Sequence, residues 1–209
     1  QAVGHVPVDF AGMGFDMLSL SAHKFHGPKG VGALYCRKGI RLPSYIMGGA
    51  QEKGRRAGTE NVAGIVGLGA AIQLATEQLE ENRAKMTALR DRLMTGIQTR
   101  ISEVKLNGHP TNRLPNNVNF SFKYIEGESI LLMLDMNGIA ASSGSACTSG
   151  SLDPSHVLLA LGLPHEIAHG SVRLTLGDET TEEDIDYTID VLEKTVARLR
   201  AMSPLYKGE

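Results

Sequence analysis

The segment from Ser21 to Gly30, Ser-Ala-His-Lys-Phe-His-Gly-Pro-Lys-Gly, most constrains what this chain can fold into. The apolar stretch before it, Phe15 to Leu20, predicts a buried strand, and Val31 to Cys36 predicts a second strand. Lys24 therefore lies where a strand gives way to a rigid Gly-Pro turn, whereas surface lysines usually occupy helices or polar loops. A nucleophilic lysine needs a desolvated or cation-rich pocket. From these ten residues alone, a lysine that snorkels from a strand end is the simpler interpretation.

Composition excludes several classes of protein. The 209 residues are 42% hydrophobic and 21% charged, which is ordinary for a globular protein with one large or two small cores. A formal net charge of −2 gives no electrostatic reason to expect nucleic acid or an anionic membrane as a partner. No apolar run approaches the length of a transmembrane helix. Two cysteines are too few for a disulfide framework, so we expect a reducing compartment, the cytoplasm.

A glycine-rich, cationic stretch from Gly48 to Asn61 lacks any apolar period. Taken alone, it predicts a flexible surface loop. Its two adjacent arginines and Thr59, which comes just before a predicted helix, offer donors that suit an anion such as phosphate.

Apolar periodicity predicts helices from Val62 to Ile101, with a break in the polar cluster Glu77 to Arg83 where the chain passes between two domains. The last helix is predicted to begin with a capping box of Thr180 and Glu183. Its buried stripe is Ile185, Ile189, Leu192, Val196 and Leu199. Between these regions we expect strands over 117–122, 139–142 and 171–176 and a helix over 129–136. This alternation indicates an α/β or α+β architecture.

The stretch from Ser142 to Ser151, Ser-Ser-Gly-Ser-Ala-Cys-Thr-Ser-Gly-Ser, contains one cysteine and no large apolar side chain. Free cysteines are usually buried, as we expect of Cys36 in its strand. Cys147, in a loop that cannot pack a core, is instead expected to be exposed and able to form a thiolate. An accidental exposed thiol is the alternative, and it is uncommon enough for a reactive role to compete with it.

Arg173 lies within the apolar strand predicted over 171–176. Its guanidinium is permanently charged and therefore needs a partner of opposite charge. A structural ion pair would satisfy it, and so would an anionic ligand.

The run His165-Glu166-Ile167-Ala168-His169 matches the zinc-protease motif literally. That chemistry needs both histidines on one face of a continuous helix. Pro164 before the run and Gly170 after it leave a segment that is too short, with no third ligand placed nearby. We interpret the match as a coincidence.

The motif Ser-x-His-Lys-x-x-Gly-Pro-Lys-Gly, the 48–61 loop, the cysteine loop and Arg173 together resemble the group I cysteine desulfurases, within the class V aminotransferase group. The resemblance covers essentially the whole chain and corresponds to the C-terminal portion of the family's chain. It implies an α/β fold of the aspartate-aminotransferase type (fold type I). Residues 1–82 would then belong to the large cofactor-binding domain and 83–209 to the small domain. We expect this chain alone to be an incomplete, inactive portion.

The resemblance also implies pyridoxal 5′-phosphate as the cofactor, carried by Lys24. Ser21 and His23 would contact its phosphate, and Gln1 falls where the family bonds the phenolic oxygen. Thr59 would reach the phosphate bound in a neighbouring subunit, which implies a homodimer.

The implied reaction removes sulfur from L-cysteine and releases L-alanine. Arg173 would bind the substrate α-carboxylate, Lys24 would take the α-proton, and Cys147 would accept the sulfur as a persulfide. An iron–sulfur scaffold or another acceptor protein would then receive it. The alternatives are a selenocysteine lyase or a related class V aminotransferase, against which the cysteine loop argues, and a non-catalytic fragment that docks sulfur acceptors.

Overall fold

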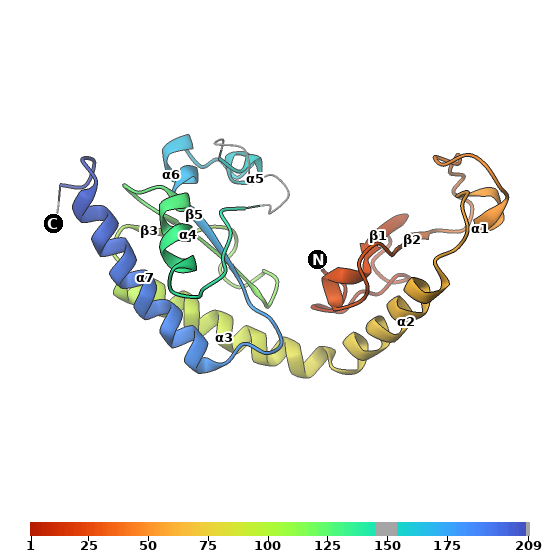
Figure 1. The fold of residues 1–209 in the computed structure, drawn as a ribbon, viewed down its shortest axis with the longest axis horizontal. Coiled ribbons are helices and arrows are strands. Elements are labelled where there is room, and N and C mark those ends of the chain that lie inside the picture. The colour runs from red at the N-terminus through yellow and green to blue at the C-terminus, as the bar shows by residue number, and fades with distance from the viewer. Residues whose placement is uncertain (145–153, 208–209) are drawn as a thin grey trace. The chain divides into compact units, whose positions relative to one another are not determined.

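The chain divides into two compact units, Gln1–Asn82 and Arg83–Glu209. The structure is a computed structural model that describes residues 1–144 and 154–207 (Figure 1). The assignment of the units to a large and a small domain stays a prediction.

A two-stranded antiparallel sheet organises the first unit. β1 (Met17–Ser21) pairs with β2 (Gly32–Cys36), and Ser21 lies opposite Gly32. Both strands form where the sequence predicts them. The expected burial of the first strand is wrong for this chain, because its residues alternate between exposed and half-buried. Among the described residues no third strand joins this sheet, and two strands alone bury little surface. Cys36 is half-buried for the same reason.

One turn of 3-10 helix, η1 (Ala22–Phe25), connects the two strands. Helix α2 (Val62–Glu77) packs against this turn. A Cβ at Gly67 would lie 2.5 Å from Cγ of Pro28, so a residue without a side chain lets the helix approach the Gly-Pro turn. Asn61 caps the start of α2 by accepting a hydrogen bond of 3.1 Å from a backbone amide in its first turn.

The predicted loop from Gly48 to Asn61 contains a single helical turn, α1 (Gln51–Gly54). Glu52 and Lys53 have φ values of 50° and 56°, so this turn is not a regular helix. The loop interpretation holds for the rest of the stretch, which is largely exposed.

The second unit is built on a three-stranded antiparallel sheet of order β3-β4-β5. The strands are β3 (Val104–Leu106), β4 (Asn117–Phe122) and β5 (Ser171–Thr175). Alternate positions of β4 and β5 place apolar side chains on one face of the sheet and polar side chains on the other. The strand predicted over 139–142 is reduced to one bridge, between Ser142 and Arg173.

Helices cover the apolar face of this sheet. α3 (Leu79–Arg100), α4 (Gly127–Asp135) and α7 (Glu182–Met202) contribute to one buried cluster with the strands. The fully buried side chains of this core include Leu93, Ile97, Val118, Phe120, Phe122, Ile130, Leu134, Val172, Leu192 and Val196. Two short helices, α5 (His156–Ala160) and α6 (His165–His169), carry a small separate cluster.

The predicted helix boundaries need one correction. α7 begins one residue later than expected, because Thr181 and Asp184, rather than Thr180 and Glu183, form the capping box. The Thr180 hydroxyl instead accepts a hydrogen bond from the amide of Gly177. The break between α2 and α3 at Gln78 agrees with the predicted break in the polar cluster.

In the part of the chain that the structure describes, no single helix is long and apolar enough to cross a membrane. Only α2 and α3 together, bent at their break, reach such a length and composition.

Candidate functional site

Ser21, His23 and Lys24 lie together on one short turn. Ser21 ends β1, and the other two belong to η1. Ala22 and Phe25 are 0% and 3% exposed, so they fix the turn to the body of the unit. The three polar side chains between and beside these anchors are exposed. The turn therefore presents a hydroxyl, an imidazole and an amine on its outer side.

The Gly-Pro sequence that follows closes this turn. The amide of Gly27 donates to the carbonyl of Ala22 at 2.9 Å, and the amide of Ala22 donates to the carbonyl of Val31 at 3.1 Å. His26 takes the left-handed conformation, with φ 65°. The Ser21 side chain makes no capping hydrogen bond to η1, which leaves its hydroxyl available for another acceptor.

These groups fit a phosphorylated pyridoxal cofactor. A hydroxyl and an imidazole can donate to a phosphate, and a primary amine can condense with an aldehyde. The pocket that would desolvate a nucleophilic lysine is not formed by the described residues, because the Lys24 side chain is exposed.

Gln1 and Thr59 lie elsewhere in the same unit. Gln1 is exposed and precedes a turn in which the amide of Val6 donates to the carbonyl of Ala2 at 3.0 Å. That turn lies against η1, because a Cβ at Gly4 would come within 2.8 Å of Cβ of Phe25. Thr59 is exposed in the loop between α1 and α2. The roles of both residues stay predictions.

Arg173 belongs to the second unit, at the middle of β5, with its side chain on the polar face of the sheet. The side chain is half-buried. Its Nε atom is buried and has no hydrogen-bond partner among the described residues. No ion pair to Arg173 is formed within those residues, so they do not supply the structural partner that the sequence allows.

The polar residues beside Arg173 were not distinguished by any motif. Asn117, Asn119 and Ser121 alternate along β4 and share the polar face with Arg173. Their alternation is the signal that predicts the strand. The same alternation places these three polar side chains on the face opposite the apolar one. A polar site on that face could have been predicted from this pattern.

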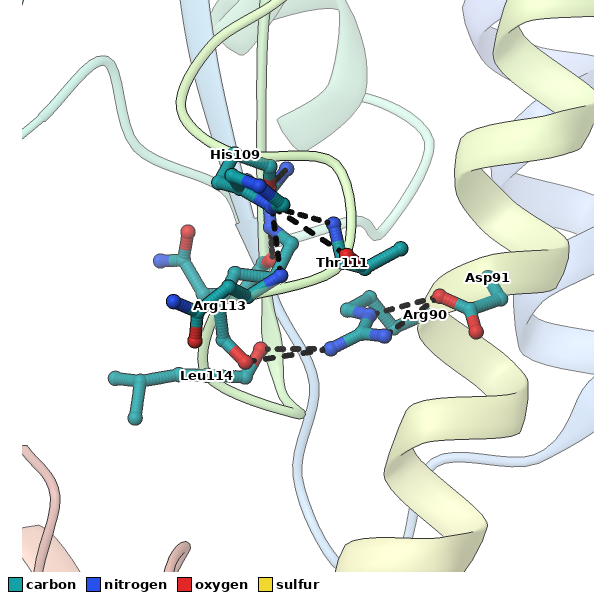
Figure 2. A network of polar contacts seen from close by, with 8 residues as sticks. Arg90, Asp91, His109, Thr111, Arg113 and Leu114 are labelled. Carbon is teal, nitrogen blue, oxygen red and sulfur yellow. Dashed lines mark hydrogen bonds and ion pairs between the residues drawn. The ribbon is translucent and has the colours of Figure 1, made fainter.

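A network of two arginines holds the loop that leads into β4 (Figure 2). Arg90, which is 5% exposed, pairs with Asp91 at 2.8 Å and donates to the carbonyl of Leu114 at 3.3 Å. Arg113 donates to the carbonyls of Asn107 and Asn117, at 3.1 Å each. Burial, with the charge of Arg90 nearby, lowers the pKa of Arg113 from its ordinary value.

Cys147 lies outside the described residues. The chain before it is described as far as Gly144, and two hydrogen bonds connect residues 142–143 to β5. The amide of Ser142 donates to the carbonyl of Arg173 at 3.1 Å, and the hydroxyl of Ser171 donates to the carbonyl of Ser143 at 3.2 Å.

The zinc-protease run forms the five-residue helix α6. The rings of His165 and His169 lie edge to face, with centroids 4.8 Å apart. In the described part of the chain no three side chains of His, Cys, Asp or Glu are grouped so that they could hold a metal ion.

The chain is similar to known proteins over nearly its full length. The family model described as aminotransferase class-V matches residues 1–188. A cysteine desulfurase IscS of Clostridium botulinum is 62% identical over 209 residues, which cover 99% of this chain and 53% of that protein. A cysteine desulfurase IscS of Dictyoglomus turgidum is 58% identical and is covered to the same share, 53%.

Solved structures agree with these relatives. A NifS-like protein matches with a TM-score of 0.85 and 37% identity, over 95% of this chain and 51% of that one. This likeness confirms the predicted α/β fold class. The chain spans about half the length of the curated relatives it matches. Which portion of them it corresponds to stays a prediction.

Proposed function

The chain belongs to the class V aminotransferase family, and on this premise we propose that it forms part of a pyridoxal-phosphate-dependent cysteine desulfurase. The observation that carries the proposal is the outward display of Ser21, His23 and Lys24 on a turn fixed by two buried side chains. The names and identities of the curated relatives support the same reaction. The cofactor, when bound, would supply an electron sink for the carbanion formed at the substrate Cα.

Each proposed residue has a task that suits its chemistry. Ser21 and His23 would hold the phosphate by donating hydrogen bonds, with Gln1 directed to the phenolic oxygen and Thr59 to the phosphate of a neighbouring subunit. Lys24 would carry the cofactor and then accept the α-proton of the substrate.

Arg173 would bind the α-carboxylate of L-cysteine, because a guanidinium and a carboxylate match in charge and in planar geometry. Its buried Nε, which has no partner among residues 1–144 and 154–207, supports the assignment of an anion to this position. The Cys147 thiolate would attack the sulfur of the substrate. A sulfur–sulfur bond forms as the carbon–sulfur bond breaks, the electron pair stays with the carbon, and protonation of that carbon leads to L-alanine.

The persulfide would pass to an acceptor protein such as an iron–sulfur scaffold. We propose a homodimer, which the exposed position of Thr59 in its loop supports, and a cytoplasmic location, which the few cysteines support.

Chemical reduction of the cofactor bond tests the central assignment. Borohydride treatment of the full-length protein loaded with pyridoxal phosphate, followed by peptide mapping, should place the pyridoxyl group on Lys24. Lys29 is the matched control, because it lies on the same connection but follows the Gly27-Pro28 turn. A pyridoxyl group on Lys29 would contradict the assignment. Release of alanine from selenocysteine but not from cysteine would instead favour a selenocysteine lyase.

A further inference from the structure

Three side chains form a row across the polar face of the second unit's sheet. Arg173 on β5 lies directly opposite Asn119 on β4. Asn107 lies just beyond β3, and its backbone N–H donates to the backbone carbonyl of Asn119 at 2.9 Å. Directly opposite residues of antiparallel strands point to the same face, with Cβ atoms about 4.5–5.5 Å apart. The side chains of Asn119 and Arg173 therefore leave the same face of the sheet as direct cross-strand neighbours.

Asn107 fixes the orientation of that carboxamide. Its Nδ2 donates to Oδ1 of Asn119 at 2.7 Å and to the hydroxyl of Ser121 at 2.9 Å. Because the oxygen of the Asn119 amide is engaged on the β3 side, its nitrogen is the group left for another partner. In the described part of the chain, Nδ2 of Asn119 donates to no residue.

The backbone of Asn107 is itself fixed by a hydrogen bond. Asn107 is 3% exposed, and its carbonyl accepts a hydrogen bond of 3.1 Å from Arg113. Arg113 also donates to the carbonyl of Asn117, at the start of β4, and Arg90 ties down the loop between them (Figure 2). The two arginines thus fix the backbone that carries the orienting residue, and supporting hydrogen bonds of this kind are what a binding site needs.

Two side chains with donors that no described residue engages consequently leave the polar face from directly opposite positions. One is the guanidinium of Arg173, whose Nε is buried without a partner in the described residues, and the other is the amide nitrogen of Asn119. A carboxylate has two oxygens that accept several hydrogen bonds, and it suits this pair better than a single neutral acceptor does.

We propose that Asn119 donates from Nδ2 to the substrate α-carboxylate held by Arg173, and that Asn107 is the residue that positions it. The inference rests on the proposed function, and it adds a second binding residue and a positioning residue to the carboxylate site. Asn119 contacts the substrate, whereas Asn107 acts through Asn119.

Two substitutions of Asn119 separate a donor role from a structural one. Asn119→Ala in the full-length, pyridoxal-phosphate-loaded protein should raise KM for L-cysteine about tenfold, because a hydrogen bond to a charged group is lost. The turnover number should change less than about threefold, since the contact is made equally in ground and transition states. Asn119→Asp keeps the oxygen that accepts from Asn107 but replaces the donor by a negative charge beside Arg173. It should raise KM more than alanine does.

The chain offers a matched control. Asn117 lies two residues away on the same face of β4, opposite Thr175 instead of Arg173. Asn117→Ala should leave KM within about twofold of the unaltered protein. Asn107→Ala should raise KM by less than Asn119→Ala, and the double variant should resemble Asn119→Ala, because the two residues act as one unit.

Equilibrium binding of L-alanine gives a readout that does not depend on turnover, since this amino acid has the same α-carboxylate and no thiol. Its Kd should rise with KM across the Asn119 variants. Near-normal KM and Kd in both Asn119 variants would overturn the inference, and so would a near-normal Asn119→Asp with only the alanine variant impaired. If Asn119→Ala fails to fold, the aspartate variant decides. If the unaltered protein releases no alanine from cysteine, the proposed function fails instead.

Discussion

Replacing Gly170 by alanine should shift β5, the strand that carries Arg173. Gly170 directly precedes this strand, and its carbonyl accepts a hydrogen bond of 2.8 Å from the amide of Phe122. A Cβ at this position would lie 2.2 Å from the carbonyl oxygen of Phe122 and 3.0 Å from that of Ile125. Both oxygens belong to the backbone, so no flexible side chain can move aside.

The cost follows from this geometry. Ordinary van der Waals contact begins at 3.4 Å, so the backbone has to separate by about 1 Å. Such overpacking typically costs about 1–3 kcal/mol, and loss of the Phe122–Gly170 hydrogen bond adds about 1 kcal/mol. The free energy of unfolding should fall by about 2–4 kcal/mol. For a chain of this length, the midpoint of thermal unfolding should fall by about 5–15 °C.

The other end of β5 supplies the control. Gly177 lies just after the strand, and a Cβ there would meet no atom within 4 Å. Gly177→Ala should therefore be neutral or raise the midpoint by a few degrees, because alanine reduces the entropy of the unfolded chain by about 0.4–1 kcal/mol. Calorimetry on the two variants and the unaltered protein provides the comparison. Equal midpoints for Gly170→Ala and Gly177→Ala would refute the steric argument.

Two further predictions concern Cys147 and the start of α7. Cys147→Ala should leave pyridoxal phosphate binding intact and abolish the protein persulfide, measured by mass spectrometry, and a normal rate of alanine release with acceptor present would contradict this. Thr181→Ala should cost about 1 kcal/mol of stability at neutral pH through loss of the helix cap, measured by denaturant unfolding. The backbone amide and hydroxyl of Thr181 donate to Asp184 and hold the pKa of its carboxyl below the ordinary value. The stabilisation is therefore full above the unfolded-state pKa and is lost as pH falls through the lower folded-state pKa. Alanine keeps the backbone amide and removes only the hydroxyl, so the stability difference between Thr181→Ala and the unaltered protein should shrink below about pH 4 by the contribution of the hydroxyl. A constant difference down to pH 2 would exclude a contribution of the hydroxyl to this linkage.

The sequence by itself determined the features that depend on neighbouring residues. The strand–turn–strand unit around Lys24 follows from two apolar runs and a Gly-Pro turn, and the display of the lysine follows from its place at the strand end. The break at Gln78 and the buried stripe of α7 follow from helical periodicity. The motif around Lys24 indicated the family from the sequence alone, because its residues lie within ten consecutive positions and need no tertiary contact to be recognised.

The local sequence did not decide which of two neighbouring capping boxes begins α7. Thr180 with Glu183 and Thr181 with Asp184 both have the spacing of a capping box. The structure forms the second, and the Thr180 hydroxyl accepts a hydrogen bond from the amide of Gly177 instead.

Only the tertiary structure decided which polar residues meet at Arg173. Asn107 and Asn119 lie more than fifty residues before it in the sequence, and the register of three strands brings them into one row. Register is set by burial of the whole apolar face, since a shift of one residue would turn that face to solvent. The same dependence on distant contacts explains why β1 is half-exposed in this chain. A strand is fully buried only by partners on both its faces and edges, and its own residues cannot supply them.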